Sequence, residues 1–382
     1  MSEWKKVTLD QMGIISRGKS KHRPRNDARL FGGRYPFIQT GDIGTAGLYV
    51  TEYSQTYNEE GLAQSKLWEK DTLCITIAAN IADTALLAFP ACFPDSIMGF
   101  IPYDNIANVK FVKYCFDILQ RDCQQISQGT AQDNLSWKKL STILFLCPPI
   151  EVQNKIADIL SRYDSLIENY QKQIKLLEES AQRLYKEWFI DLRFPGHENT
   201  KIVDGVPEGW EKKKVGDLIS KVVRTKQVSA NNYLNSGCIP VIDQSRNYIA
   251  GYTNDIECLV EVTTPYIVFG DHTRVLKYVP FSFAKGADGT QIIMSNDLER
   301  MPQSLFYNSL IEIDLSNYSY ARHFKYLKEE LVLLPSKYIA ERFDKVVSQY
   351  FQSIQKNREQ IRLLTEARDR LLPKLMSGEI EV

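Results

Sequence analysis

Residues 148–190 read PPIEVQNKIADILSRYDSLIENYQKQIKLLEESAQRLYKEWFI, and they predict one long helix around which the rest of the chain is organised. Its apolar residues recur at alternating intervals of four and three, which is typical of the seam of a coiled coil. The seam residues are Ile156, Leu160, Tyr163, Ile167, Tyr170, Ile174, Leu177, Ala181, Leu184 and Trp188. Pro148 and Pro149 mark the expected helix start. A helix of roughly 40 residues rises 1.5 Å per residue and spans roughly 60 Å.

The same pattern returns 187 positions later, after Pro335. Ten residues are repeated at this offset: Pro148, Ser161, Ile167, Gln173, Ile174, Leu176, Leu177, Glu179, Arg183 and Leu184 return as Pro335, Ser348, Ile354, Gln360, Ile361, Leu363, Leu364, Glu366, Arg370 and Leu371. The second seam keeps the spacing but holds polar residues at Asn357 and Arg368. We therefore expect two equal helices that pair antiparallel within the chain, with Asn357 helping to fix their register.

The starts of the two halves also match. The segment WKKVTLD begins at Trp4, and WEKKKVGD begins at Trp210. Between these starts and the helices the halves differ in sequence and length, so the chain is a duplication whose ends stayed similar.

The two variable parts predict small α+β domains with mixed β-sheets. Short β-type runs at 35–39, 72–77, 239–242 and 266–269 are separated by segments rich in Gly, Pro, Asn and Asp. The predicted boundaries are 1–147 for the first domain, 148–190 for the first helix, 191–209 for a linker, 210–334 for the second domain and 335–382 for the second helix.

Composition limits the class of protein. Hydrophobic residues make up 43% and charged residues 25% of the 382 residues, as in globular proteins with two or three domains. No apolar run is long enough to span a bilayer, and the first residues lack the apolar core of a signal peptide. The 7 cysteines are scattered, without a C-x-x-C pair, which is typical of reduced thiols. We expect a cytoplasmic protein with no membrane partner.

Charge is balanced overall but not locally. The chain has 47 Lys plus Arg and 47 Asp plus Glu, whereas a protein that binds DNA by itself usually has a basic excess. Nine basic residues and three acidic ones lie between residues 1 and 35, and six basic and two acidic ones between 210 and 228. Two basic clusters at matching places of a repeat indicate a role beyond solvation.

One motif suggests a different chemistry. Gly13-Ile-Ile-Ser-Arg-Gly18-Lys19-Ser20 satisfies the phosphate-loop pattern G-x-x-x-x-G-K-[ST] of nucleotide hydrolases. The pattern requires a following helix, but Pro24 interrupts the next residues, and no apolar strand ending in a magnesium-binding Asp follows downstream. We therefore interpret the segment as a basic loop.

Other catalytic patterns are missing from the sequence. The four histidines, at 22, 197, 272 and 323, have no metal-ligand spacing, and there is no Gly-rich dinucleotide motif. The run Cys147-Pro148-Pro149-Ile150 lacks the polar first residue of an amino-methyltransferase motif. We expect no catalytic residue, no metal site and no bound cofactor in this chain.

The order of segments resembles the specificity subunit of type I restriction–modification systems, over essentially the whole chain. Four local stretches carry the resemblance besides the duplication: FIQTGDI from Phe37, GTAQDNLS from Gly129, WFIDLRFPG from Trp188 and PEGW from Pro207. The second half departs from the first, because YARH from Tyr320 replaces the QDNLS segment. This departure leaves the contacts of the second module open.

The resemblance implies a non-catalytic subunit whose two modules are target recognition domains. Each domain would read one half of a split site in double-stranded DNA, and the antiparallel helices would set the distance between the halves. The helices would also dock two methyltransferase subunits that carry S-adenosylmethionine, with or without two motor–nuclease subunits that use ATP. Half-sites read from one face of DNA lie about one turn, roughly 34–36 Å, apart.

Candidate DNA contacts follow from side-chain chemistry. Arg and Lys bind phosphates and the guanine edge, Asn and Gln can bond adenine, and Ser and Thr assist. In the first module we choose Lys19, Lys21, Arg23, Arg25, Gln39 and Thr40. In the second module we choose Arg224, Lys226, Gln244, Arg246, Asn247, His272 and Arg274.

Two aromatic residues near the end of the first helix, Tyr185 and Phe189, are candidates for partner docking, and packing against the following segment is the alternative.

Two other protein classes also remain open at this point. A nucleotide hydrolase would bind ATP through Lys19, and a stand-alone DNA-binding or scaffold protein with a coiled-coil arm would form a stable homodimer.

Overall fold

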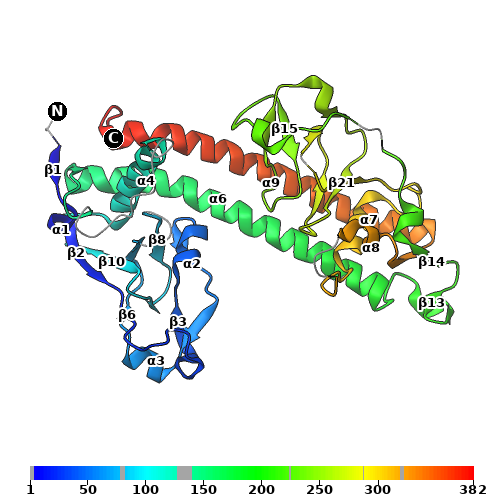
Figure 1. The fold of residues 1–382 in the computed structure, drawn as a ribbon, viewed down its shortest axis with the longest axis horizontal. Coiled ribbons are helices and arrows are strands. Elements are labelled where there is room, and N and C mark those ends of the chain that lie inside the picture. The colour runs from blue at the N-terminus through cyan, green and yellow to red at the C-terminus, as the bar shows by residue number, and fades with distance from the viewer. Residues whose placement is uncertain (1–3, 78–81, 127–139, 223–224, 287, 319–321) are drawn as a thin grey trace. The chain divides into compact units, whose positions relative to one another are not determined.

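The computed structural model describes residues 4–77, 82–126, 140–222, 225–286, 288–318 and 322–382. The chain divides into two compact units. Unit 1 holds Met1–Gln171 and Glu359–Val382, and unit 2 holds Lys172–Arg358. Helices α6 (Ile150–Tyr185) and α9 (Lys337–Ser377) each contribute a segment to both units (Figure 1).

Unit 1 is built on two mixed sheets. The first has the order β2-β10-β7-β8-β4, in which only β4 and β8 are parallel. Its strands are β2 (Gly13–Arg17), β10 (Ile97–Pro102), β7 (Leu73–Thr76), β8 (Thr84–Leu87) and β4 (Tyr49–Val50). The second has the order β5-β3-β9-β6, with β5 (Gln55–Tyr57), β3 (Phe31–Phe37), β9 (Ala91–Cys92) and β6 (Leu67–Trp68).

Helices cover the sheets of unit 1. They are α1 (Leu9–Met12), α2 (Thr40–Thr45), α3 (Glu59–Ala63) and α4 (Val109–Ile126). Residues of α4, such as Phe111, pack in one core with Leu73 of the sheet, Leu160 of α6 and Leu372 of α9. The helix pair is therefore part of the hydrophobic core of this unit.

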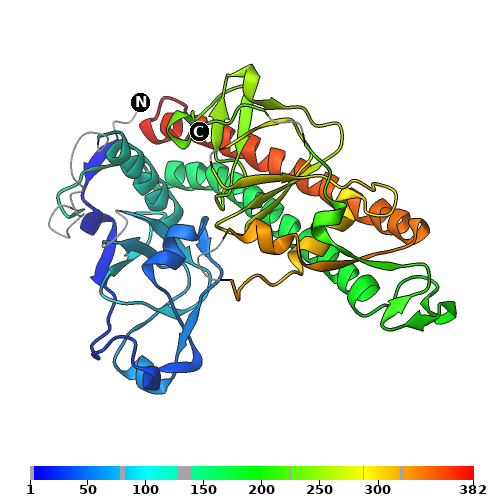
Figure 2. The same cartoon turned by 45° about the vertical axis from the view of Figure 1, so that its right-hand side comes forward.

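Unit 2 has the same kind of α+β construction with a different sheet arrangement. One sheet has the order β16-β15-β20-β17 and the other β19-β18-β21. Their strands are β16 (Gly251–Thr253), β15 (Ile239–Ile242), β20 (Phe283–Lys285), β17 (Leu259–Val260), β19 (Leu276–Val279), β18 (Tyr266–Gly270) and β21 (Thr290–Ile293). Its short helices are α7 (Gln303–Ile311) and α8 (His323–Leu327), and Figure 2 shows the strands of this unit beside the orange part of α9.

The duplication is visible in how each unit enters its long helix. In unit 1, β1 (Lys5–Val7) pairs antiparallel with β11 (Phe145–Cys147), which leads into α6. In unit 2, β14 (Glu211–Lys214) pairs antiparallel with β22 (Leu331–Leu334), which leads into α9. Because the matching starts at Trp4 and Trp210 precede these strands, the repeated sequence at both ends of each half forms one repeated structural element.

The predicted antiparallel pairing of the helices is confirmed in unit 2, where Glu178 and Tyr185 of α6 meet Arg358 and Phe343 of α9. In unit 1, Asp164 of α6 contacts Arg368 of α9. As residue numbers rise along α6 they fall along α9. The polar seam residue Asn357 is buried and donates a hydrogen bond to the amide oxygen of Gln173 at 3.2 Å. This pair satisfies a buried amide at the seam, as register-fixing polar residues require.

Residues 191–209, expected as a linker, are ordered against unit 2. Phe194 is buried, with its ring centroid 4.7 Å from that of Trp210. The hairpin β12 (Ile202–Val203) and β13 (Val206–Pro207) turns at Asp204 and Gly205, which both have positive φ, as a tight two-residue hairpin loop requires. A buried aromatic ring therefore ties this segment to the core.

No helix in the described ranges combines the length and the apolar character needed to cross a bilayer.

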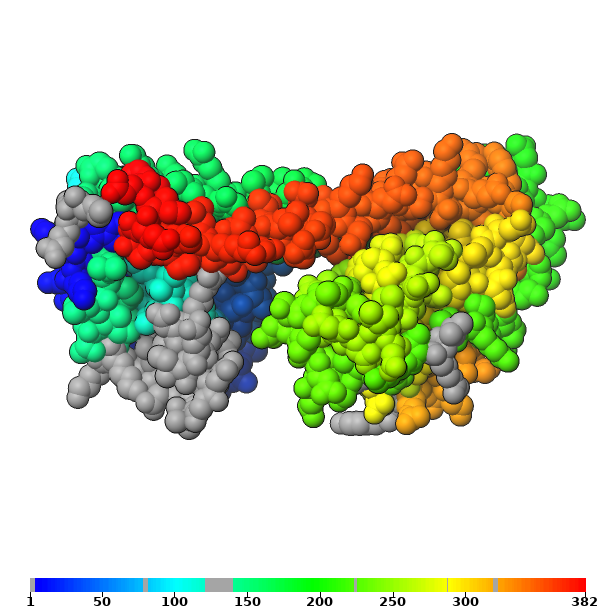
Figure 3. Space-filling view, turned by 90° about the horizontal axis from the view of Figure 1, so that it is seen from above, coloured from blue at the N-terminus to red at the C-terminus, as the bar shows by residue number. Residues whose placement is uncertain are grey.

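The orange part of α9, on the face seen in Figure 3, remains uncovered beside the yellow residues of unit 2. Part of the helix surface in this unit is thus open to solvent.

Candidate nucleic-acid interface

The basic loop of the first module follows β2 directly. Backbone N–H groups anchor it, since Gly18 donates to Ile97 O at 2.8 Å and Lys19 to Phe93 O at 3.0 Å. The residue Gly13 lies inside β2, paired with Pro102 of β10, so the phosphate-loop pattern falls on a strand and not on a loop before a helix. The interpretation of this segment as a basic loop is therefore supported by its local structure.

Arg23 and Arg25 share one carboxylate. Their guanidinium groups lie 3.8 Å and 2.5 Å from the carboxylate of Asp95, and both side chains are about half exposed. Arg23 also donates to the carbonyl oxygens of Ser20 and His22. Exposed ion pairs contribute about 0–1 kcal/mol, so Asp95 can orient these groups without excluding a phosphate.

Lys19 and Lys21 complete the set in this loop, and their ammonium groups make no ion pair within the part of the chain that is described. At the other end of the loop, hydrogen bonds from Arg29 and His22 hold the pKa of the Asp27 carboxyl well below its usual range. Asp27 thus stays ionised and fixes the fold of the loop.

Gln39 and Thr40 lie at the start of α2. The segment before them is joined to the basic loop through two adjacent carbonyls, because Cys92 O accepts from Ile38 N while Phe93 O accepts from Lys19 N. The side chain of Gln39 is exposed, but its Nε2 donates to Gln55 Oε1 at 2.7 Å. The structure therefore places the segment before Gln39 beside the start of the basic loop at Lys19.

In the second module, Gln244 joins three loops. Its Nε2 donates to Asp288 O at 2.9 Å, and its Oε1 accepts from the backbone N of His272 at 3.1 Å. The hydroxyl of Thr273 donates to Gln244 O at 2.6 Å. The amide that was expected to read adenine is thus engaged within the protein, and its first role is to hold the loops together.

The remaining candidates of the second module differ in exposure and in how far their polar groups are already bonded within the protein. Arg246 and Asn247 are exposed. Arg274, at a positive φ of 61°, donates to Leu315 O at 3.1 Å, so its guanidinium is partly engaged. Lys226 lies 2.7 Å from Asp255 and 3.2 Å from Glu257, and these carboxylates raise its pKa. Arg224 lies outside the described residues.

Of the two alternatives for Tyr185 and Phe189, the structure shows packing against the following segment and not an exposed docking face. Their side chains retain 5% and 2% of their exposure and stack on each other with centroids 5.2 Å apart. Both rings belong to the core of unit 2, together with Trp210 and Phe343. Helical spacing at the end of α6 could not distinguish a docking face from a core face, because residues 191–210 supply the covering side chains.

Sequence reasoning missed Lys277. This lysine lies in β19, is 4% exposed, and its ammonium donates to Asp243 O at 2.7 Å and to Asn247 O at 2.5 Å. The charge is thereby placed under the loop that carries Arg246. A lysine flanked by Leu276, Tyr278 and Val279 in a β-type run is the signal that could have found it.

Burial lowers the pKa of Lys277 to about 8, and Asp243 offsets part of this effect. In the unfolded chain a lysine titrates at about 10.4. Between these values the unfolded chain binds more protons, so the contribution of Lys277 to the free energy of unfolding rises from about pH 8 to about pH 10.4. Below pH 8 the cost of the buried charge is fully present.

We therefore expect the difference in unfolding free energy between the natural chain and a Lys277→Met variant to shift in favour of the natural chain as pH rises. Urea denaturation of both proteins from pH 7 to pH 10 measures this difference and cancels the titration of all other groups. A difference that is independent of pH would contradict the buried, perturbed ammonium.

Each unit thus has a polar surface, formed by these loops, that presents guanidinium, ammonium and amide groups. In the described ranges no cluster of three or more His, Cys, Asp or Glu side chains could hold a metal ion. The donors and charges on both surfaces match those by which proteins bind DNA phosphates and base edges.

Comparison with known proteins shows which proteins this chain is similar to. Residues 1–179 match the family described as the type I restriction modification DNA specificity domain. The MjaIX specificity subunit of Methanocaldococcus jannaschii is 26% identical over 100% of this chain and 94% of its own length. The HindI specificity subunit of Haemophilus influenzae is 23% identical over 100% of both chains. Residues 1–179 thus match the DNA specificity domain, and over its whole length the chain is similar to type I restriction enzyme specificity subunits, which are non-catalytic.

A solved structure has the same fold. The S subunit of a type I restriction–modification system from M. genitalium superposes with a TM-score of 0.61 at 18% identity, covering 98% of this chain and 96% of that one. This match supports the fold class of two mixed-sheet domains with paired long helices.

Proposed function

We propose that this chain reads a split, asymmetric DNA sequence, with unit 1 binding one half-site and unit 2 the other. The observation that carries the proposal is the repeated frame: β1–β11 leading into α6 and β14–β22 leading into α9 enclose two different sheet arrangements. Because the two frames have the same structure, they can dock two copies of the same partner. Because the sheets inside the frames differ, the two units can bind different half-sites.

The helices would dock two methyltransferase subunits, with or without two motor–nuclease subunits. S-adenosylmethionine and ATP would then be held by those partners and not by this chain. Since Tyr185 and Phe189 are buried, other residues of the helices would form the docking surface for the methyltransferase subunits. The protein would then act on DNA in the cytoplasm.

The decisive experiment maps DNA methylation by long-read sequencing in a host that expresses the chain with the methyltransferase encoded beside it. The control host expresses the methyltransferase alone. A split, asymmetric methylated motif that appears only with this chain supports the proposal. A stable complex without any motif would overturn the reading of DNA, and no complex at all would favour the stand-alone scaffold.

The basic loop of unit 1 gives a more local prediction. We expect the double variant Arg23→Ala/Arg25→Ala to bind the cognate DNA roughly tenfold more weakly, because two phosphate contacts are removed. The slope of log affinity against log salt should fall by about one for each lost contact. Fluorescence anisotropy of the assembled complex at several salt concentrations measures both quantities.

The matched control is Arg370→Ala, which removes a charge of the same sign from an exposed position on α9. This variant should keep the salt slope of the natural chain. Equal slopes for the loop variant and the natural chain would show that the loop makes no phosphate contact.

A further inference from the structure

The loop 243–248 of unit 2 joins β15 to the segment before β16 and presents Arg246 and Asn247 to solvent. Lys277 holds the loop near both of its ends, because its ammonium donates to Asp243 O and to Asn247 O. The exposed side chains of Arg246 and Asn247 therefore lie in a loop whose backbone is held at Asp243 and Asn247. Their orientation also depends on what holds Tyr248, the last residue of the loop.

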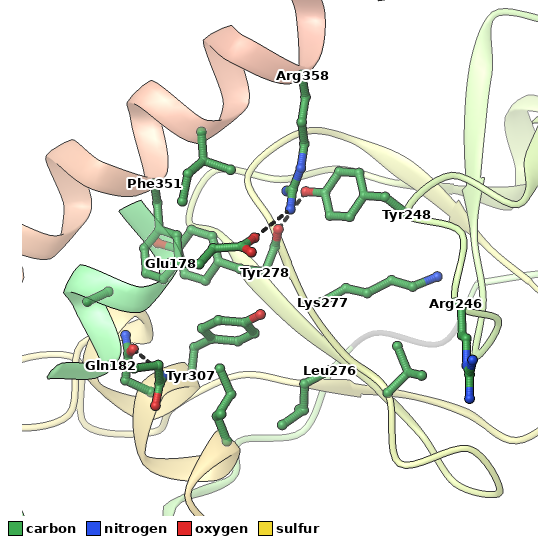
Figure 4. A pocket seen from close by; sticks show the side chains of 15 residues that line it. Glu178, Gln182, Arg246, Tyr248, Leu276, Lys277, Tyr278, Tyr307, Phe351 and Arg358 are labelled. Carbon is green, nitrogen blue, oxygen red and sulfur yellow. Dashed lines mark hydrogen bonds and ion pairs between the residues drawn. The ribbon is translucent and has the colours of Figure 1, made fainter. Parts of the chain in front are cut away.

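The far end is held by a helix residue. The guanidinium carbon of Arg358, on α9, lies 3.7 Å from the ring centroid of Tyr248 (Figure 4). The hydroxyl of Tyr248 donates to Tyr278 O at 2.6 Å, and its ring meets Phe281 edge-on at 6.0 Å. A guanidinium over an aromatic face at this distance is attractive, and more so away from water.

Arg358 is itself oriented by the other helix. Its NH2 group lies 3.1 Å from Oε1 of Glu178, on α6, so the cation is held between a carboxylate and an aromatic ring. Burial raises the pKa of Glu178 and Arg358 counteracts this effect. The two helices thus jointly present one charged group to the loop.

A cavity of about 280 Å³ lies beside this contact, between the loop and the helices, and Arg246, Tyr248, Tyr307 and Arg358 are among its lining residues. Side chains next to a cavity have fewer packing partners, so the loss of one contact leaves them less constrained. Without Arg358, Tyr248 would keep its contacts with Tyr278 O and Phe281, but the ring face that Arg358 covers would lose its partner.

We propose that Arg358 is a positioning residue for sequence recognition: with Glu178 it holds Tyr248 and so sets the loop from which Arg246 and Asn247 meet the second half-site. This inference rests on the proposed reading of a half-site by unit 2 and extends it to residues of the helix pair. Base discrimination by a side chain requires that its anchor be fixed, because a misplaced donor loses the geometry of its hydrogen bonds.

The test compares the natural chain with Arg358→Ala and Arg358→Lys, each in complex with its methyltransferase. The measurement is methylation of DNA libraries in which every base of both half-sites is varied. For Arg358→Ala we expect discrimination to fall about tenfold or more at bases of one half-site, while the other half-site is read as before. Lysine keeps the charge but not the planar group, so Arg358→Lys should lie between.

The control is Arg342→Ala, since Arg342 also lies over a tyrosine, Tyr338, but one on its own helix. This variant should read both half-sites normally. Glu178→Gln keeps the size of the side chain, and we expect it to relax the same half-site as Arg358→Ala. It serves as the second probe if the alanine variant does not fold.

Hydrogen exchange of the amide of Ala250, which donates to Val241 O at the base of the loop, should be faster in both loop-releasing variants. Unchanged discrimination in Arg358→Ala and Glu178→Gln overturns the inference, as does an equal loss at both half-sites. A natural chain that yields no split motif would instead overturn the proposed function, and the exchange measurement would still report whether Arg358 holds the loop.

Discussion

Replacing Phe189 by alanine should lower the free energy of unfolding by about 3–5 kcal/mol. The ring is 2% exposed, and its centroid lies 5.2 Å from that of Tyr185, 5.2 Å from that of Phe343 and 5.5 Å from that of Trp210. Removing it leaves a cavity at the point where the helix end, the segment 191–210 and α9 meet. Urea denaturation followed by circular dichroism measures the loss.

The neighbouring residue provides the matched control. Ile190 is 58% exposed, so Ile190→Ala should change the free energy of unfolding by about 0.5 kcal/mol or less. If Phe189→Ala were as stable as Ile190→Ala but failed to bind a methyltransferase, the ring would be a docking residue and its burial would be wrong. We expect the opposite order of effects.

The second large effect is expected at the seam in unit 1. Arg368 lies 2.6 Å from Asp164, whose side chain is 6% exposed, and the hydroxyl of Tyr114 donates to the second oxygen of Asp164 at 2.5 Å. Arg368→Ala leaves this carboxylate buried without its cation. Breaking such a pair costs about 3–5 kcal/mol, and thermal or urea unfolding should show a loss of this size.

Two comparisons make this prediction specific. Arg370 pairs with Glu366 on the surface, and Arg370→Ala should cost about 0.5 kcal/mol or less. Replacing both charged partners, as Asp164→Leu/Arg368→Leu, should restore part of the loss, because no unpaired charge remains and only the Tyr114 hydroxyl loses its acceptor. A small effect of Arg368→Ala, close to that of Arg370→Ala, would mean that water reaches Asp164 and that the pair is not buried.

The sequence predicted the helices well because their signal is periodic and local. The apolar spacing of residues 156–188 and its repeat after Pro335 identified α6 and α9 and their antiparallel pairing. Four β-type runs likewise became β3, β7, β15 and β18. In these elements the spacing of apolar residues within a short stretch of chain is enough to predict which face is buried.

The candidate contacts were predicted less completely, because their partners are distant in sequence. Asp95 orients Arg23 and Arg25 from 70 or more positions away. Gln244 carries an amide suited to adenine, yet that amide is engaged by Asp288 and His272. Side-chain chemistry indicates what a group can bind, and the loops that converge on it decide whether the group is available.

The duplication, the paired helices, the α+β class of both modules and the family resemblance could all be predicted from the sequence, since they depend on periodicity and on repeated segments. Which polar groups are exposed and which are held by other residues became known from the folded structure. Phe189 became core, Lys277 became the support of a loop, and Arg358 reached Tyr248 across the unit. Burial and pairing of a side chain are set by residues that folding brings beside it, and a linear pattern does not contain those neighbours.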